Sequence, residues 1–149
     1  MSRTITRSAV AEVFGKNVVF VHGTDDPTDA EWEELMGIYR AVGDMASARC
    51  LVYTDGGRPN AGQRARLNQV MNGQQPLIAV LTPSALARAA GKAIAFFNPR
   101  FRMFDPEQID AALKHLGASS LESVQFKNLV RELRLVVSNK RIDAGAYRP

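Results

Sequence analysis

The chain begins with two short runs of β-prone residues and then alternates between helical and strand patterns. Residues 9–14 and 17–22 are separated by Gly15 and Lys16, and the second run contains four consecutive apolar residues, 18–21. An unbroken apolar run is typical of a central strand that is buried on both faces. The pattern therefore predicts an initial pair of strands that adds an antiparallel edge to a sheet.

The next segment predicts a helix, a strand and a second helix. Thr28 and Glu31 have the spacing of a capping box, and apolar residues then recur at helical spacing up to Val42. Residues 50–54 have the apolar pattern of a buried strand, which a glycine-containing turn separates from a helix that Asn60 can cap.

The order of strand and helix then repeats over residues 77–81, 84–97, 101–104 and 105–116. Thr82 and Pro83 are typical of a helix start, and Gly117 is typical of a helix end. Short links between successive strands and helices favour parallel strands with right-handed crossovers. We therefore predict an α/β fold with a mixed, mostly parallel sheet of about five strands, four crossover or flanking helices and an extra C-terminal helix.

This extra helix begins at a second capping box, formed by Ser119 and Glu122, and carries an apolar stripe. Two interpretations stay open, because the stripe can pack on its own domain or on a second copy of the chain. A homodimer would use Leu121, Phe126, Leu129, Val130, Leu133 and Val137. We predict a domain over residues 1–117, this helix over 118–138 and a flexible tail over 139–149, where periodicity is absent.

Size and composition indicate one soluble domain. The chain has 149 residues, 46% of them apolar, and its apolar runs are far shorter than the roughly 18 residues that a membrane span needs. The first residues lack the apolar run of a signal peptide, so we expect a cytoplasmic protein without membrane contact. Cys50 is the only cysteine, which excludes an internal disulfide, and its place in an apolar strand predicts a buried thiol.

The net charge of +4 is distributed unevenly along the chain. Acidic residues concentrate between Asp25 and Glu34, whereas many arginines come later. Basic residues interleaved with aromatic ones are the usual mark of nucleic-acid binding, and no such run occurs. The distribution fits a partner protein with an acidic surface, and we do not expect binding to nucleic acid.

Several residues that can perform chemistry follow the predicted strands. Ligands gather at the carboxyl ends of strands in open α/β sheets, and the residues there include His22, Asp25, Asp26 and Thr82. A histidine among carboxylates can bind a metal or transfer protons, but helix caps and turns require the same residue types. The standard hydrolase, nucleotide-binding, zinc and dinucleotide motifs are missing from the sequence. We therefore predict no catalytic residue, metal or cofactor.

The acidic pair, Asp55 and Thr82 partly resemble a response-regulator receiver domain, in which such residues surround magnesium at successive strand ends. The resemblance is incomplete, because only one helix fits between Asp26 and Asp55 and no lysine follows the strand near Phe104. A receiver-like phosphoryl-binding domain, or a small-molecule or metal-dependent enzyme, is the alternative functional hypothesis.

The succession of elements over residues 9–116 resembles the STAS domain, the fold of bacterial anti-sigma-factor antagonists and of sulfate-transporter tails. The resemblance implies a non-enzymatic regulatory module that binds another protein in signal transduction. In that family, the helix after the third strand begins with a serine or threonine that a partner kinase phosphorylates. The corresponding residues 55–62 contain no hydroxyl side chain, so the resemblance is to stand-alone STAS-like proteins without the usual phosphorylation switch.

The same loop and helix start provide the predicted binding surface. Backbone amides at a helix start attract anions, and three arginines surround this one. The predicted partner- or anion-binding residues are Asp55, Gly57, Arg58, Asn60, Arg64 and Arg66. An acidic protein surface or a small phosphorylated ligand would suit them, and ordinary solvated arginines are the alternative. A structural homo-oligomer, assembled through the C-terminal helix, is the third hypothesis.

Overall fold

Six strands form one sheet, and their order in space follows their order in the sequence. The computed structural model describes residues 2–83, 85, 88–89, 92 and 98–146. The strands are β1 (Ser2–Ile5), β2 (Ala9–Phe14), β3 (Asn17–His22), β4 (Arg49–Thr54), β5 (Leu77–Leu81) and β6 (Phe101–Phe104). β1, β2 and β3 pair antiparallel, whereas β3, β4, β5 and β6 pair parallel. The expected α/β fold with a mixed, mostly parallel sheet is therefore confirmed.

The prediction of about five strands missed β1. This strand has the sequence Ser-Arg-Thr-Ile, and three of its four residues are exposed. An edge strand with little buried surface carries no apolar run that would reveal it. β1 forms one edge of the sheet. β2, which the sequence placed in an edge pair, therefore lies inside the sheet.

The described helices are α1 (Asp29–Met36), α2 (Ala61–Met71), α4 (Ile109–His115) and α5 (Ser120–Ala146), with 3-10 turns η1 (Gly37–Ala41), η2 (Met45–Ser47) and η3 (Pro106–Gln108). The capping boxes of Thr28, Asn60 and Ser119 form as predicted. The first helix was expected to continue to Val42, but it tightens into η1 at Gly37, and η1 still buries Ile38. The helix predicted over residues 84–97 lies largely outside the described residues.

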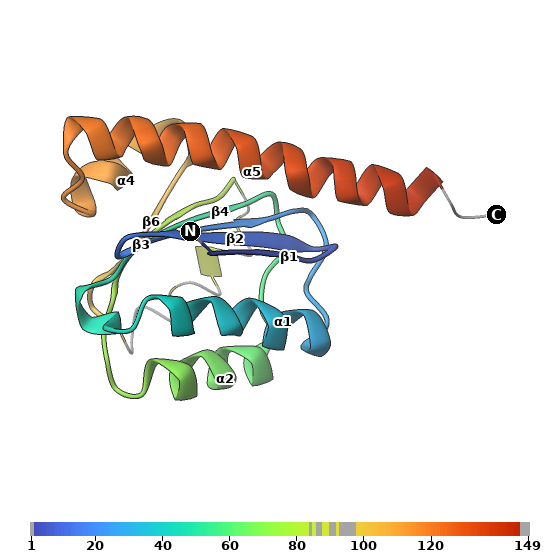
Figure 1. The fold of residues 1–149 in the computed structure, drawn as a ribbon, viewed down its shortest axis with the longest axis horizontal. Helices are drawn as coiled ribbons and strands as arrows, with labels where there is room; N and C mark the ends of the chain where they lie inside the picture. Colours follow the sequence, from blue (N-terminus) through green and yellow to red (C-terminus); the bar gives the residue numbers. More distant parts are fainter. Residues whose placement is uncertain (1, 84, 86–87, 90–91, 93–97, 147–149) are drawn as a thin grey trace.

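The helices cover both faces of the sheet (Figure 1). Side chains alternate between the two faces along each strand, so Phe20 packs with the layer of α1 and α2, whereas Val19 and Val21 pack with α4 and α5. β3 is fully buried, as its apolar run predicted.

α5 packs on the sheet of its own chain. Of the six residues named for a homodimer, Phe126, Leu129, Val130, Leu133 and Val137 are buried in the core beside β2 and β3, and only Leu121 is exposed, at 70%. The five buried side chains therefore offer no surface to a second copy. The helix also extends to Ala146 instead of ending near residue 138. No helix among the described residues combines the length and hydropathy that a membrane span requires.

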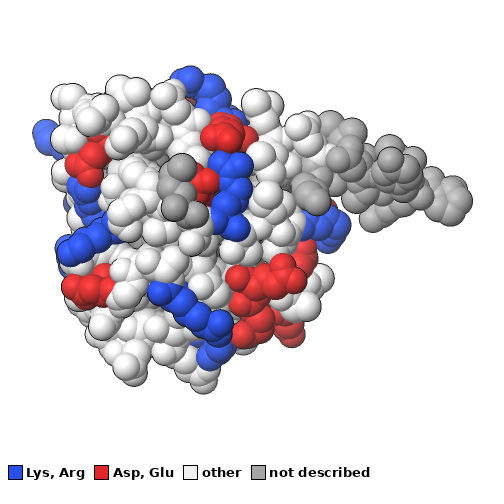
Figure 2. Space-filling view, in the orientation of Figure 1, with Lys and Arg blue, Asp and Glu red and all other residues white. Residues whose placement is uncertain are grey.

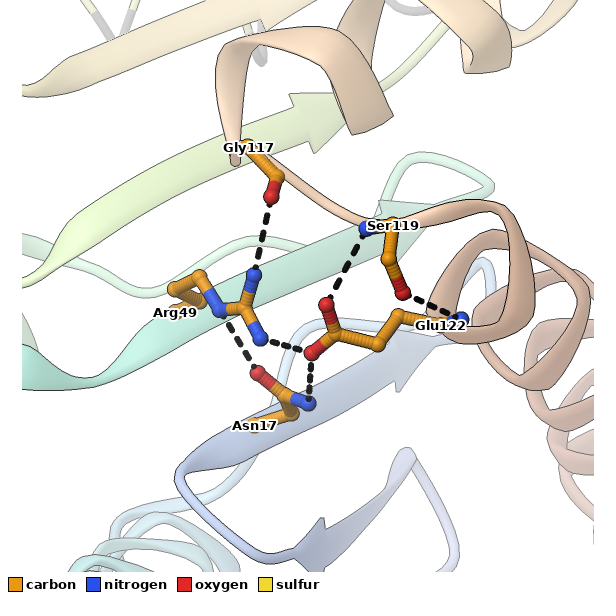
Figure 3. Close-up of polar contacts among 5 residues, drawn as sticks. All are labelled: Asn17, Arg49, Gly117, Ser119 and Glu122. Carbon is orange, nitrogen blue, oxygen red and sulfur yellow. Dashed lines mark hydrogen bonds and ion pairs between the residues drawn. The ribbon is translucent and has the colours of Figure 1, made fainter.

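A cluster of polar side chains fixes the start of α5 to the sheet (Figure 3). Arg49 on β4 pairs with Glu122, and its guanidinium also donates to the Asn17 Oδ1 atom, at 3.0 Å, and to the Gly117 carbonyl, at 3.2 Å. The Ser119 amide donates to the other Glu122 oxygen, at 3.0 Å. The Ser119 amide and the Arg49 guanidinium lower the pKa of Glu122 to about 2.

Glu122→Gln is expected to lower the free energy of unfolding by about 1 kcal/mol at pH 7, because it removes a charged hydrogen-bond acceptor from this cluster. The folded pKa of Glu122 lies below its ordinary value of 4.5, so its stabilising contribution is present above pH 4.5 and is lost as the pH falls toward 2. Thermal melts of both proteins from pH 7 to pH 2 should therefore converge in acid. Glu107→Gln, at an exposed position, is the control. A difference in melting temperature between wild type and Glu122→Gln that stays constant with pH would contradict the stabilising role of the Glu122 carboxylate.

Candidate functional site

The loop between β4 and α2 is held in a fixed conformation. The Thr54 hydroxyl donates to the Gly57 carbonyl, at 2.6 Å, and accepts from the Gly56 amide, at 3.1 Å. The Gly57 amide donates to the Gly23 carbonyl of the loop after β3, at 2.9 Å. A side chain at Gly57 would collide with this neighbouring loop, since its Cβ atom would lie 2.4 Å from the Asp25 carbonyl oxygen. Glycine is therefore required for the close approach of the two loops.

The start of α2 is capped by the side chains of Asn60 and Gln63. The Asn60 side chain accepts from the Gln63 amide, at 2.8 Å, and the Gln63 side chain accepts from the Asn60 amide, at 3.0 Å. Just before the cap, the Arg58 amide donates to the Asp26 carboxylate, at 3.0 Å. The amides of Arg58, Asn60 and Gln63 thus have internal partners, and the side chain of Asn60 has a structural role.

The three arginines of the predicted surface differ in their surroundings. Arg66 forms an ion pair with Glu33 on α1, with 2.7 Å between Nε and Oε1. Arg64 donates to the Pro59 carbonyl, at 3.1 Å. Within the described part of the chain, no carboxylate lies within ion-pair distance of the guanidinium of Arg58 or of Arg64. Figure 2 shows acidic side chains gathered over α1, beside basic ones that lie between α1 and α2.

The acidic residues at the strand ends do not converge on one point. Asp25 pairs with Arg7, at 3.0 Å, and Asp55 lies 3.9 Å from the guanidinium of Arg134 on α5. Thr82 is fully buried, and its amide donates to the Phe104 carbonyl, at 3.0 Å. Considering the described residues alone, no three His, Cys, Asp or Glu side chains are close enough to hold a metal ion.

The His22 ring faces the layer of α1 and α2. Its ring stacks against Phe20, with centroids 5.0 Å apart, and against Trp32, at 6.3 Å. Burial lowers the pKa of His22 to about 4, although the nearby Asp26 carboxylate opposes the shift. The imidazole is therefore neutral at neutral pH. Its Nδ1 atom is buried and has no hydrogen-bond partner among the described residues.

His22 lines a pocket between the sheet and α2. The cavity has a volume of about 100 Å³. Its described lining comprises Phe20, His22, Trp32, Tyr39, Cys50, Val52, Thr54, Gly57, Arg58, Pro59, Arg64, Leu67, Ile78, Val80, Phe101 and Met103. The structure thus brings His22, from the strand-end group, together with Gly57, Arg58 and Arg64, from the predicted binding surface. Asp25, Asp26, Asp55, Asn60, Arg66 and Thr82 are not part of this lining.

The apolar members of the lining were expected only as core residues. They sit at alternate positions of neighbouring strands, as in Phe20 and His22 on β3 or Val52 and Thr54 on β4, where the last inward-facing residue is polar. This change from apolar to polar at the strand end is the sequence signal that marks the pocket. Cys50, another lining residue, is buried as predicted, and burial raises the pKa of its thiol to about 12.

A comparison of the chain with protein-family models, with curated proteins and with solved structures finds no significant match. The resemblance to STAS domains therefore stays a prediction, which is based on the order of the elements.

Proposed function

We propose that the protein is a non-enzymatic, STAS-like regulatory module that binds an acidic surface of another protein. The contact is made by the loop of residues 55–60 and the first turns of α2, here called the loop face. The observation that carries this proposal is the pair of guanidinium groups of Arg58 and Arg64, which have no carboxylate partner in the described structure.

Rigidity of the loop face supports this role. The loop is held by Thr54, Gly57 and the Asn60 cap, so its arginines are presented without a large loss of conformational entropy on binding. α2 itself contains no acidic residue, so no charge within the helix opposes an acidic partner. Exposed Ala61, Gly62 and Ala65 leave room for close approach. Complementary charge of this kind accelerates association and selects the partner.

Regulation by phosphorylation at this loop is not part of the proposal. Residues 55–62 contain no serine, threonine or tyrosine. The Thr54 hydroxyl, which is the nearest one, is buried and bonded to the loop backbone.

Charge reversal at Arg58 and Arg64 together is expected to weaken partner binding by about tenfold or more, while the melting temperature stays nearly unchanged. The measurement is a quantitative pull-down from the native host with wild type and Arg58→Glu/Arg64→Glu. Arg102→Glu/Arg131→Glu changes the net charge equally, at exposed positions on β6 and α5, and is the matched control. Equal recovery of bound protein by wild type and the loop-face variant would refute the proposal.

A further inference from the structure

We infer that the pocket between α2 and the sheet is a binding site for a small aromatic carboxylate. The ring of this ligand would lie against the apolar strands, and its carboxylate would lie at His22, Arg58 and Arg64. The inference shares Arg58 and Arg64 with the proposed protein contact, because both residues also line the pocket, but it is tested without a partner protein.

The polar end of the pocket has one unsatisfied group. His22 is 4% exposed, and its Nδ1 atom has no hydrogen-bond partner in the described structure. Buried polar atoms are almost always paired, so an orphaned nitrogen on a residue that lines a cavity points to a ligand atom. A neutral imidazole with its proton on Nδ1 donates to a carboxylate oxygen. The Thr54 hydroxyl is already bonded to the loop, and the Trp32 Nε1 atom already donates to the Gln63 carbonyl.

The charge of the ligand follows from the two arginines. Arg58 and Arg64 are half-buried and line the same pocket. Guanidinium groups recognise carboxylates through planar pairs of hydrogen bonds. Neither guanidinium has a carboxylate partner among the described residues. A ligand anion would therefore form an ion pair with both.

The body of the ligand follows from the remaining walls. Phe20, Val52, Leu67 and Val80 give an apolar surface opposite the polar end. The volume of about 100 Å³ approaches that of an engineered apolar cavity, about 150 Å³, that binds benzene. The cavity is smaller than that one, so a single ring is the most that it can hold, and a long acyl chain exceeds it. Inorganic anions would leave the apolar walls unfilled.

The test is a titration of the wild-type protein with benzoate, followed by calorimetry and by the fluorescence of Trp32. Trp32 is the only tryptophan and lines the pocket. We expect saturable binding with a Kd of about 1 mM or lower. Benzamide, which has the same shape without the charge, should bind at least about tenfold more weakly. Acetate, which has the charge without the ring, should not saturate.

Two variants separate a binding role from a structural one. His22→Phe replaces the orphaned nitrogen with an apolar ring, so it should weaken benzoate binding about tenfold while its melting temperature equals or exceeds that of wild type. Arg58→Gln/Arg64→Gln should bring the affinity for benzoate down to that for benzamide and leave benzamide binding unchanged. Arg102→Gln/Arg131→Gln is the control and should bind benzoate like wild type.

The absence of saturable benzoate binding to wild type, or equal affinities for benzoate and benzamide, would overturn the inference. Unchanged benzoate affinity in the Arg58→Gln/Arg64→Gln variant would overturn it as well, and this variant decides the question if His22→Phe does not fold. Because these measurements involve no partner protein, their failure would leave the result of the pull-down unaffected.

Discussion

Replacing Phe126 with alanine will lower the free energy of unfolding by about 3–5 kcal/mol. The Phe126 side chain is 0% exposed and lies in the core between α5 and the sheet. Its ring packs edge-on against Phe14, with centroids 5.1 Å apart. Truncation would leave a cavity in this layer and remove the aromatic contact. Urea denaturation, monitored by circular dichroism, measures the loss as a lower midpoint with an unchanged slope.

Leu121→Ala is the matched control on the same helix, because Leu121 is 70% exposed. Leu121→Ala should change the free energy of unfolding by no more than about 0.5 kcal/mol. A small effect of Phe126→Ala would mean that α5 does not pack on its own domain.

Gly57→Ala will destabilise the protein by about 2–3 kcal/mol, through a steric collision with the backbone. The new Cβ atom would lie 2.4 Å from the Asp25 carbonyl oxygen and 2.9 Å from that of Gly23. Relief requires the loop after β4 to move away from the loop after β3, which breaks the hydrogen bond between the Gly57 amide and the Gly23 carbonyl. Thermal and urea unfolding measure the loss of stability.

Gly62→Ala provides a control with the opposite sign. Gly62 lies in the first turn of α2, where a Cβ atom would meet only the Asn60 Oδ1 atom, at an ordinary contact distance of 3.5 Å. Alanine is the better helix former, so this change should stabilise the protein or leave it unchanged. If Gly57→Ala and Gly62→Ala lost similar free energies of unfolding, the contact between the two loops would not be the reason for glycine at position 57.

Much of the fold could be predicted because local signals agreed with the tertiary structure. The capping boxes at Thr28, Asn60 and Ser119 set helix starts correctly, and the apolar runs set β4, β5 and β6 nearly to the residue. β1 was missed because an exposed edge strand has no apolar pattern. The far end of α5 was missed because Ser138 and Asn139, which follow the last buried residue Val137, are exposed and do not continue the apolar stripe.

The candidate site was only half predictable. Arg58 and Arg64 were found from their place at a helix start, and His22 from its place at a strand end. Their meeting in one pocket depends on the register that sets His22 beside Thr54, and on the face to which each side chain points. When the strand pairing is unknown, the sequence determines neither this register nor the face to which each side chain points. The structural role of Asp26, which accepts from the Arg58 amide, likewise depends on a contact between distant segments. Asn60 caps α2 and is not part of the pocket lining.

The length of α5 restricts the directions from which a large molecule can reach the loop face. The helix passes the carboxyl end of β3 where Val137 lies against Gly23, and it continues to Ala146, roughly 13 Å farther. Figure 1 shows this last part projecting past the sheet. Arg134, on the same helix, lies beside Asp55 at the beginning of the loop. The projecting helix therefore hinders the approach of a large partner from the side of α5. We expect such a partner to reach the loop face from the side of α2.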